Sequence, residues 1–160
     1  MARHTEKTNA LRLAETAGIA YEPCEYTTED GRTDAVSIAA KIGRTPDEVF
    51  KTLVTVSPDR EYFVFVVPAV GELDLKKAAK AAGAKSIAML PLKELFPLTG
   101  YVHGGCSPLG MKKLFTTFID ETALLFDRIC VSGGRVGLNI AVSPEALAEV
   151  IRAGFKDLTR

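Results

Sequence analysis

The sequence predicts a single α+β domain with a mixed, barrel-like β-sheet and surrounding helices. The chain has 160 residues, which is enough for one ordinary domain and too few for two. Hydrophobic residues make up 47% and charged residues 25% of the chain, a balance typical of a globular protein with a buried core. The expected strands and helices do not alternate as regular βαβ units, which disfavours a Rossmann fold.

The first part of the chain predicts two helices that flank a strand and a loop. Alanine and leucine recur at helical spacing over residues 8–17. A strand is expected at 21–26, and Pro23 indicates an edge position or a bulge. The polar segment 27–34 is expected to be a loop. The second helix, 35–42, lies between an aspartate and a glycine that suit its two ends.

The middle of the chain predicts a short helix, a hairpin and a further full helix. The segment Thr45–Glu48 has a capping threonine, a proline and a glutamate in the order of a capping box, which opens a short helix. Two apolar runs, 51–56 and 62–67, are separated by a Ser-Pro-Asp turn and predict a buried β-hairpin. A helix is expected over 75–82, with Leu75 among its inward-facing residues.

The second half of the chain predicts short strands around a glycine-rich loop and a C-terminal helix. Strands are expected at 86–89, 116–119, 128–131 and 137–142, a helical turn at 92–96 and a helix over about 144–152. Ser132-Gly133-Gly134 is expected to form a turn between two of these strands. No repeat, linker or domain boundary is visible, so residues 1–160 are expected to form one domain.

Charge and cysteine content restrict the classes of function. Lys and Arg number 20, as do Asp and Glu, whereas a nucleic-acid-binding domain usually has a basic excess. Any contact with nucleic acid must therefore use a local patch or depend on a partner. Cys24, Cys106 and Cys130 have no paired spacing and indicate free thiols in a reducing, cytoplasmic compartment.

Neither a metal or cofactor site nor a membrane segment is expected. The chain has two histidines and no His, Cys and acid cluster at ligand spacing. The longest apolar stretch, 62–70, contains a proline and is about half the length that a membrane-spanning helix needs. The N-terminus lacks the apolar centre of a signal peptide.

Two features could carry chemistry, and each has a structural alternative. The loop Gly104–Gly110 contains three glycines and a proline, so its backbone N–H groups could converge on a carbonyl oxygen or a phosphate; alternatively, it is a structural turn. Lys51 could bind a phosphate or polarise an ester carbonyl, or it could stabilise the end of a helix. A nucleophilic Cys106 with His103 as its base is disfavoured, because the loop offers no acid to orient the histidine.

The densest basic cluster lies on the helix expected over 75–82. Lys76, Lys77 and Lys80 form either a solvated helix face or a contact surface for a phosphate backbone.

Four segments occur in an order that resembles the YbaK/EbsC family, relatives of the editing domain of bacterial prolyl-tRNA synthetase. They are Val49–Leu53, Glu72–Ala79, Gly100–Gly110 and Val131–Gly134. The resemblance covers nearly the whole chain. It implies trans-editing, which is hydrolysis of the ester of mischarged tRNA, most typically Cys-tRNA(Pro), with the thiol of the substrate as nucleophile. It also implies that prolyl-tRNA synthetase is a partner and holds the tRNA.

The resemblance implies roles for particular residues. The catalytic residues would be Lys51, Gly104 and Gly105, and the substrate-binding residues Tyr26, Thr52, Ser107, Ser132 and Asn139. Two departures concern specificity: residues 27–36 contain no aromatic, and an asparagine stands at 139 where the family usually has an acid. A deacylase for another small amino acid such as alanine, or a non-catalytic tRNA- or nucleotide-binding module, therefore remains an alternative.

Overall fold

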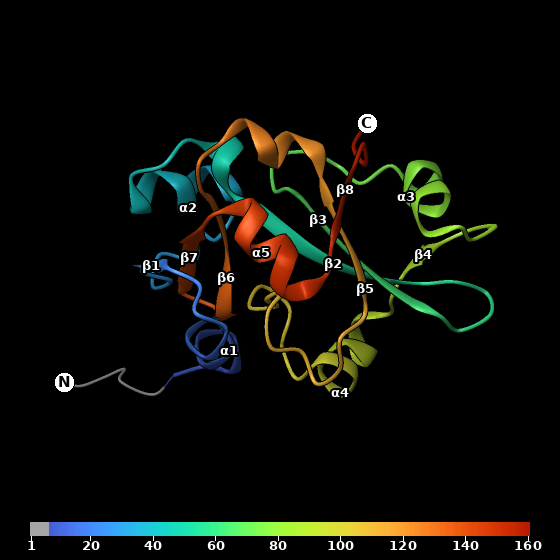
Figure 1. Cartoon of the computed structure of the whole chain (residues 1–160). Helices are drawn as coiled ribbons and strands as arrows, with labels where there is room; N and C mark the ends of the chain where they lie inside the picture. The colour runs from blue at the N-terminus through green and yellow to red at the C-terminus, as the bar shows by residue number, and fades with distance from the viewer. Residues whose placement is uncertain (1–6) are drawn as a thin grey trace.

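Two β-sheets with helices packed around them organise the computed structural model, which describes residues 7–160 (Figure 1). The antiparallel three-stranded sheet has the order β1-β7-β6, and the mixed five-stranded sheet has the order β4-β2-β3-β5-β8. The strands are β1 (Tyr21–Glu25), β2 (Phe50–Val56), β3 (Tyr62–Pro68), β4 (Ala88–Met89), β5 (Thr116–Asp120), β6 (Ile129–Arg135), β7 (Leu138–Val142) and β8 (Gly154–Lys156). The α+β class is confirmed, but the strands of the described chain form two sheets and no closed barrel.

Helices connect and cover these sheets. They are α1 (Asn9–Ala17), α2 (Ala35–Ile42), α3 (Leu75–Ala82), α4 (Leu95–Thr99) and α5 (Pro144–Ile151), with 3₁₀ turns η1 (Pro46–Glu48), η2 (Leu92–Glu94) and η3 (Glu121–Leu125). The expected cap of α2 is present, because the Asp34 side chain accepts from the N–H of Ser37; at the start of α3, Asp74 accepts from the N–H groups of Lys76 and Lys77. The expected hairpin is also present, because β2 and β3 pair antiparallel over their whole lengths.

The capping box at Thr45 opens a short helix as expected, a 3₁₀ turn of three residues, and strand pairing begins two residues later at Phe50. Two local expectations are wrong, each because pairing or packing overrides a local signal. Ser132-Gly133-Gly134 lies within β6 rather than in a turn, and a bulge there shifts the pairing with β7. Leu75 is 38% exposed, because α3 packs through small alanines further along the helix.

Strand β8 was not expected, because its three residues are too few to show a strand pattern. It forms by parallel pairing with β5 after α5 returns the chain to the sheet.

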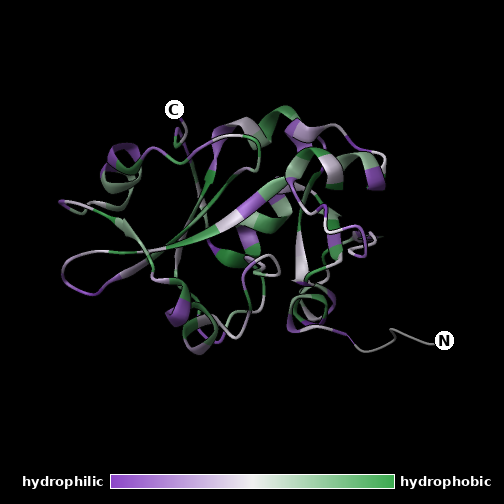
Figure 2. Ribbon diagram, turned by 180° about the vertical axis from the view of Figure 1, so that it is seen from behind, coloured by the Kyte–Doolittle hydropathy of each residue, from purple (hydrophilic) through white to green (hydrophobic). Residues whose placement is uncertain are grey.

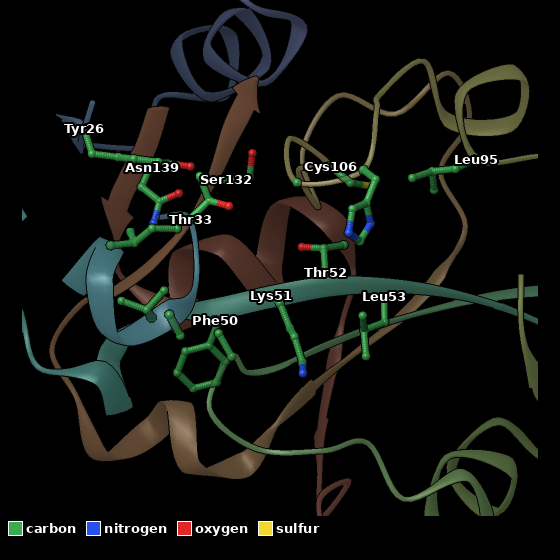
Figure 3. Close-up of a pocket in the computed structure, with 16 residues that line it drawn as sticks. Tyr26, Thr33, Phe50, Lys51, Thr52, Leu53, Leu95, Cys106, Ser132 and Asn139 are labelled. Carbon is green, nitrogen blue, oxygen red and sulfur yellow. The ribbon is translucent and has the colours of Figure 1, made fainter. Parts of the chain in front are cut away.

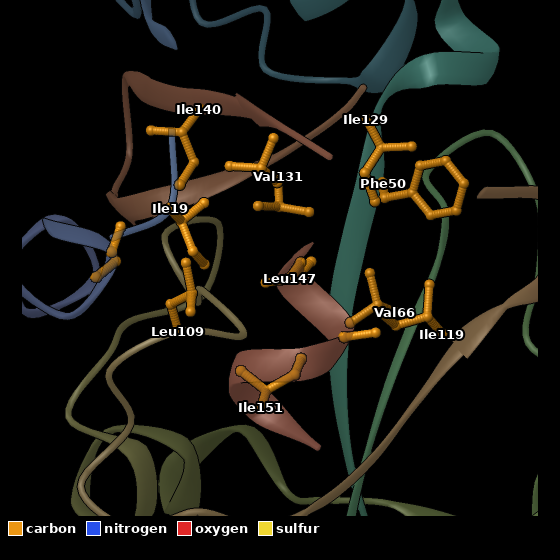
Figure 4. Packing of buried hydrophobic residues seen from close by; sticks show 14 of the residues in the cluster. Ile19, Phe50, Val66, Leu109, Ile119, Ile129, Val131, Ile140, Leu147 and Ile151 are labelled. Atoms are coloured by element: carbon orange, nitrogen blue, oxygen red, sulfur yellow. The ribbon is translucent and has the colours of Figure 1, made fainter. Parts of the chain in front are cut away.

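The main core lies between the two sheets and α5 (Figure 4). Side chains of β2, β3 and β5, including Phe50, Val66 and Ile119, pack there with those of β6, β7 and α5. A second cluster lies under α3 and joins Phe65 and Val67 to the helix alanines. Burial on both faces explains the continuous apolar run of β3.

Figure 2 shows the molecule from the opposite side, coloured by the hydropathy of each residue. The β2–β3 turn is hydrophilic, and the strands that lead to it are largely apolar. Among the described residues, no helix combines the length and apolar character needed to cross a membrane. All three cysteines are free thiols, as expected.

Candidate active site

A cavity of about 300 Å³ opens beside β2, between the three-stranded sheet and the glycine-rich loop (Figure 3). Its lining comes from the end of β1, the loop that leads to α2, α2 itself, β2, α4, β6 and β7. Many of the residues that the sequence singled out line it: Tyr26, Lys51, Thr52, His103, Gly104, Cys106, Ser132 and Asn139. Residues far apart in the sequence therefore meet in one place.

Strand β2 positions Lys51 and Thr52 on opposite sides, because side chains alternate along a strand. The ammonium of Lys51 donates to the carbonyl oxygen of Gly71 at 2.8 Å. In Figure 3 this ammonium lies below the β2 ribbon, whereas Thr52, Ser132 and Asn139 lie above it. An ammonium has three N–H donors, so two remain for a ligand after the bond to Gly71.

Thr52 buries a hydroxyl that has no partner. Its Oγ1 is inaccessible to solvent and makes no hydrogen bond within residues 7–160. Leaving a buried hydroxyl unpaired costs about 1–3 kcal/mol, and such groups are rare in folded proteins. In Figure 3 the hydroxyl lies on the same side of β2 as Cys106 and Ser132. Because solvent does not reach it, a ligand can bond to it only after neighbouring side chains move.

Ser132 and Asn139 form a polar pair on the wall opposite. They are direct partners in the pairing of β6 with β7, so both side chains lie on one face of the sheet. The Ser132 hydroxyl oxygen accepts from the N–H of Gly134 at 3.1 Å and keeps its own proton to donate. Asn139 is only 5% exposed and brings a carboxamide with both donor and acceptor atoms.

The glycine-rich loop is held against the β6–β7 turn. Gly104 lines the cavity and has a positive φ of 85°. Gly105 does not line it; its N–H donates to the carbonyl of Val102, and a Cβ added there would lie 2.9 Å from the backbone of Arg135 and Val136. Gly105 therefore sets how closely the loop approaches the turn.

Ser107 is also absent from the cavity lining. It is fully buried, and its hydroxyl oxygen accepts from the N–H of Leu109 at 3.2 Å within the same loop. This contact shapes the loop behind Gly104.

Cys106 lines the cavity but is poorly suited to be a nucleophile. Burial raises the pKa of its thiol to about 12, although a hydrogen bond with Thr99 acts in the opposite direction. The thiol therefore stays protonated at neutral pH. Within residues 7–160, no Asp or Glu lines the cavity, and no cluster of three or more His, Cys, Asp or Glu residues could hold a metal ion.

The lysines of α3 lie outside this cavity. In Figures 1 and 2, α3 lies at the end of the molecule away from β1, β6 and β7. The ammonium of Lys77 contacts the Asp157 carboxylate at 3.0 Å and the Thr159 carbonyl at 2.7 Å. Lys77 is thus partly neutralised within the fold.

Sequence reasoning missed the side of the cavity formed by Thr33, Ala35, Ile38 and Leu95. The sequence shows that residues 27–36 contain no aromatic. It does not indicate that the 27–34 loop and α2 face β2. Leu95 lies at the start of the short helix α4, and the apolar residues of this helix show no recognisable sequence pattern.

Comparisons with known proteins identify the family of this chain. Residues 29–150 match the family described as "Aminoacyl-tRNA editing domain". The chain is 42% identical over 154 residues to the "Putative Cys-tRNA(Pro)/Cys-tRNA(Cys) deacylase EbsC" of Enterococcus faecalis (strain ATCC 700802 / V583), covering 96% of this chain and 94% of that protein.

Two solved structures share the fold. A crystal structure described as "a putative trans-editing enzyme for prolyl tRNA synthetase" has a TM-score of 0.85 and 25% identity, covering 98% of this chain and 99% of that one. The hypothetical protein APE2540 has a TM-score of 0.85 and 21% identity, covering 95% and 99% of the two chains.

Proposed function

Because the chain belongs to the aminoacyl-tRNA editing domain family, we propose that it is a trans-editing deacylase that removes cysteine from mischarged Cys-tRNA. The relative from Enterococcus faecalis is named for Cys-tRNA(Pro) and Cys-tRNA(Cys), and its identity to this chain extends over nearly all of both proteins. Cys-tRNA(Pro) is the expected principal substrate, and residues 1–160 are the editing domain.

The single observation that carries this proposal is the cavity whose lining brings Lys51 and Thr52 of β2 together with Ser132 and Asn139 of the three-stranded sheet. An aminoacyl ester has a carbonyl oxygen that gains negative charge during cleavage and an α-amine that needs acceptors. The backbone N–H of Gly104 stabilises the developing oxyanion, and Lys51 joins it once its ammonium turns from the Gly71 carbonyl into the cavity. The side chains of Thr52, Ser132 and Asn139 bind the aminoacyl group, with Tyr26 beside them.

The chemistry proceeds through the thiol of the substrate. No Asp or Glu of the described chain lines the cavity, and the thiol of Cys106 stays protonated, so the protein offers no nucleophile activated by a base. In a bound cysteinyl ester, the sulfur and the carbonyl carbon belong to the same molecule, so the attack of one on the other is intramolecular. Holding the two in reactive geometry is then a large part of catalysis.

A second candidate substrate is an ester of another small amino acid such as alanine. It is favoured by the cavity wall at Thr33 and Ala35, where no aromatic restricts the space, and by the uncharged Asn139. The partner proposed is prolyl-tRNA synthetase, in the cytoplasm, because a chain with balanced charges needs another protein to hold the tRNA firmly.

A deacylation panel tests the function. The esters of Cys, Ala, Ser and Pro on tRNA(Pro), and of Cys on tRNA(Cys), are incubated with the protein with and without the synthetase. We expect Cys-tRNA to be cleaved far faster than the other esters, and Cys106→Ala to retain this activity. Equal cleavage of Ala-tRNA(Pro) would mean that a bound water is the nucleophile. A panel with no cleavage at all would favour a non-catalytic tRNA-binding module.

A further inference from the structure

Cleavage by the substrate's own thiol requires two proton transfers, one from the thiol and one to the ribose oxygen that leaves. A cysteine thiol has an ordinary pKa of about 8.5, so only a few per cent of it is the nucleophilic thiolate at neutral pH. The ribose oxygen that leaves the carbonyl must also gain a proton. Neither the oxyanion donors nor the binding residues described above accept the first proton.

The cavity holds few groups that can accept it. The ionisable side chains in its lining are Tyr26, Lys51, His103 and Cys106, and no carboxylate of residues 7–160 joins them. A phenol and an ammonium hold their protons at neutral pH, and burial keeps the Cys106 thiol protonated. Histidine is the side chain that ordinarily gains and loses a proton between pH 5 and 8.

The position of His103 suits proton exchange with both substrate and solvent. Its side chain is exposed and lines the cavity next to Gly104, whose positive φ turns the loop at this point. The hydrogen bond from the Gly105 N–H to the Val102 carbonyl closes the turn around it. The loop thus holds the imidazole at the edge of the cavity.

Two charged residues that neighbour the loop or the cavity lining form ion pairs. Arg135, in the strand packed against Gly105, contacts the Glu25 carboxylate at 2.9 Å. Glu94, beside the cavity residue Leu95, contacts Arg60 at 3.0 Å. Lys51 on β2 is a cation that shares the cavity lining, and its ammonium is bonded to the Gly71 carbonyl.

We propose that His103 carries the proton in the cleavage of Cys-tRNA, an inference that rests on the proposed deacylase function. The neutral imidazole takes the proton of the substrate thiol. The sulfur then bonds to the ester carbonyl carbon, and the bond from this carbon to the ribose oxygen breaks. The imidazolium returns the proton to that oxygen. The products are the cysteine thiolactone and tRNA with a free hydroxyl; water then opens the thiolactone to cysteine.

The test compares wild type, His103→Gln and His103→Ala in single-turnover deacylation of Cys-tRNA(Pro) between pH 6 and 9. At pH 7 we expect a loss of about 100-fold in both variants, the lower end of the range for general acid–base catalysis. The loss should shrink above about pH 8.5, because the substrate thiol then ionises unaided. Added imidazole should restore part of the activity of His103→Ala, since the position is open to solvent.

The possible outcomes separate this role from others. A rate at pH 7 within twofold of wild type in both variants would overturn the role of His103 and leave the deacylase function intact. A loss that stays constant with pH, without rescue by imidazole, would mean that His103 only positions the substrate and would also overturn it. A wild-type protein inactive on every ester would overturn the proposed function, and this inference with it. Circular dichroism of both variants checks that the fold is retained.

Discussion

The Thr52 hydroxyl is a buried polar group with no hydrogen-bond partner among residues 7–160. Its neighbour on β2, Lys51, differs in having one fixed partner, the Gly71 carbonyl. The free protein therefore bears the cost of one unpaired hydroxyl, and a ligand that bonds to it would recover that cost. At the scale of single residues, the cavity is arranged for a polar ligand rather than for the stability of the empty protein.

Replacing Thr52 by valine should therefore stabilise the protein while it weakens activity. Valine keeps the shape and removes the unpaired hydroxyl, so we expect the free energy of unfolding to rise by about 1 kcal/mol and the melting temperature by roughly 2–4 °C. The kcat/KM for Cys-tRNA(Pro) should fall about tenfold, the equivalent of one lost hydrogen bond of about 1.4 kcal/mol. Thr52→Ser keeps the hydroxyl and is the matched control. A fully active Thr52→Val would show that the hydroxyl does not contact the substrate.

Replacing Lys51 by methionine should remove most of the activity. A preorganised donor to a developing oxyanion is worth about 3–4 kcal/mol, or a factor of hundreds to a thousand in kcat. The melting temperature should change little, because the lost bond to Gly71 is one hydrogen bond of about 1 kcal/mol. Lys156→Met, on the exposed strand β8, removes the same charge far along the chain and serves as the control. A loss of less than tenfold with Lys51→Met would count against its role.

At the scale of elements, the glycine-rich loop and the β6–β7 turn form one unit. The loop requires glycine for two different reasons: Gly104 has a positive φ, and Gly105 lies against the backbone of Arg135 and Val136. The first requirement concerns the local backbone conformation, and the second concerns the distance between two segments. Together they set where the loop lies relative to Ser132 in β6.

Alanine substitutions should separate these two requirements. Gly83→Ala, at the end of α3, has a similar positive φ with open space around it, so it reports the conformational cost alone, about 1–2 kcal/mol, with unchanged activity. Gly104→Ala should cost a similar amount and also reduce turnover. Gly105→Ala should lower the melting temperature most, because backbone must move to admit its Cβ. Melting temperature and deacylation rate are measured for all three, and a Gly105→Ala as stable as Gly83→Ala would contradict the close packing.

At the scale of the whole molecule, basic and acidic side chains are equal in number, and an ion pair within the fold partly neutralises the lysine cluster of α3. The chain has 20 basic and 20 acidic side chains. In the densest cluster, the ammonium of Lys77 is paired with Asp157, which leaves Lys76 and Lys80 as the exposed lysines of α3. An isolated protein of this kind has little means of holding a tRNA tightly.

Binding of tRNA by the isolated protein should be weak and sensitive to salt. We expect a Kd in the range typical of non-specific binding, about 10⁻⁴–10⁻⁶ M, that weakens as salt rises and tightens when prolyl-tRNA synthetase is added. If α3 contacts phosphates, the double variant Lys76→Ala/Lys80→Ala should reduce the salt slope by about two. Filter binding across a salt series measures both quantities. Tight binding that salt does not change would contradict this expectation.

Local sequence signals predicted most elements because their causes are local. The caps at Asp34 and Asp74, the glycines that end α1 and α2, and the β2–β3 hairpin all depend on residues a few positions apart. The ordered motifs identified the family, and with it the residues of the proposed site, because they lie in short contiguous strings.

What only the tertiary structure decided depends on contacts between distant segments. Pairing with β7 made Ser132–Gly134 part of β6 instead of a turn, and pairing with β5 created β8. The close approach of the loop to Arg135 gave Gly105 its packing role, and the fold left the Thr52 hydroxyl without a partner. It also placed His103 in the cavity lining while the lysines of α3 stay outside. Hydrogen-bond partners and steric limits supplied by residues far away in the chain have no signature in the local sequence, so these features emerge only when the sheets assemble.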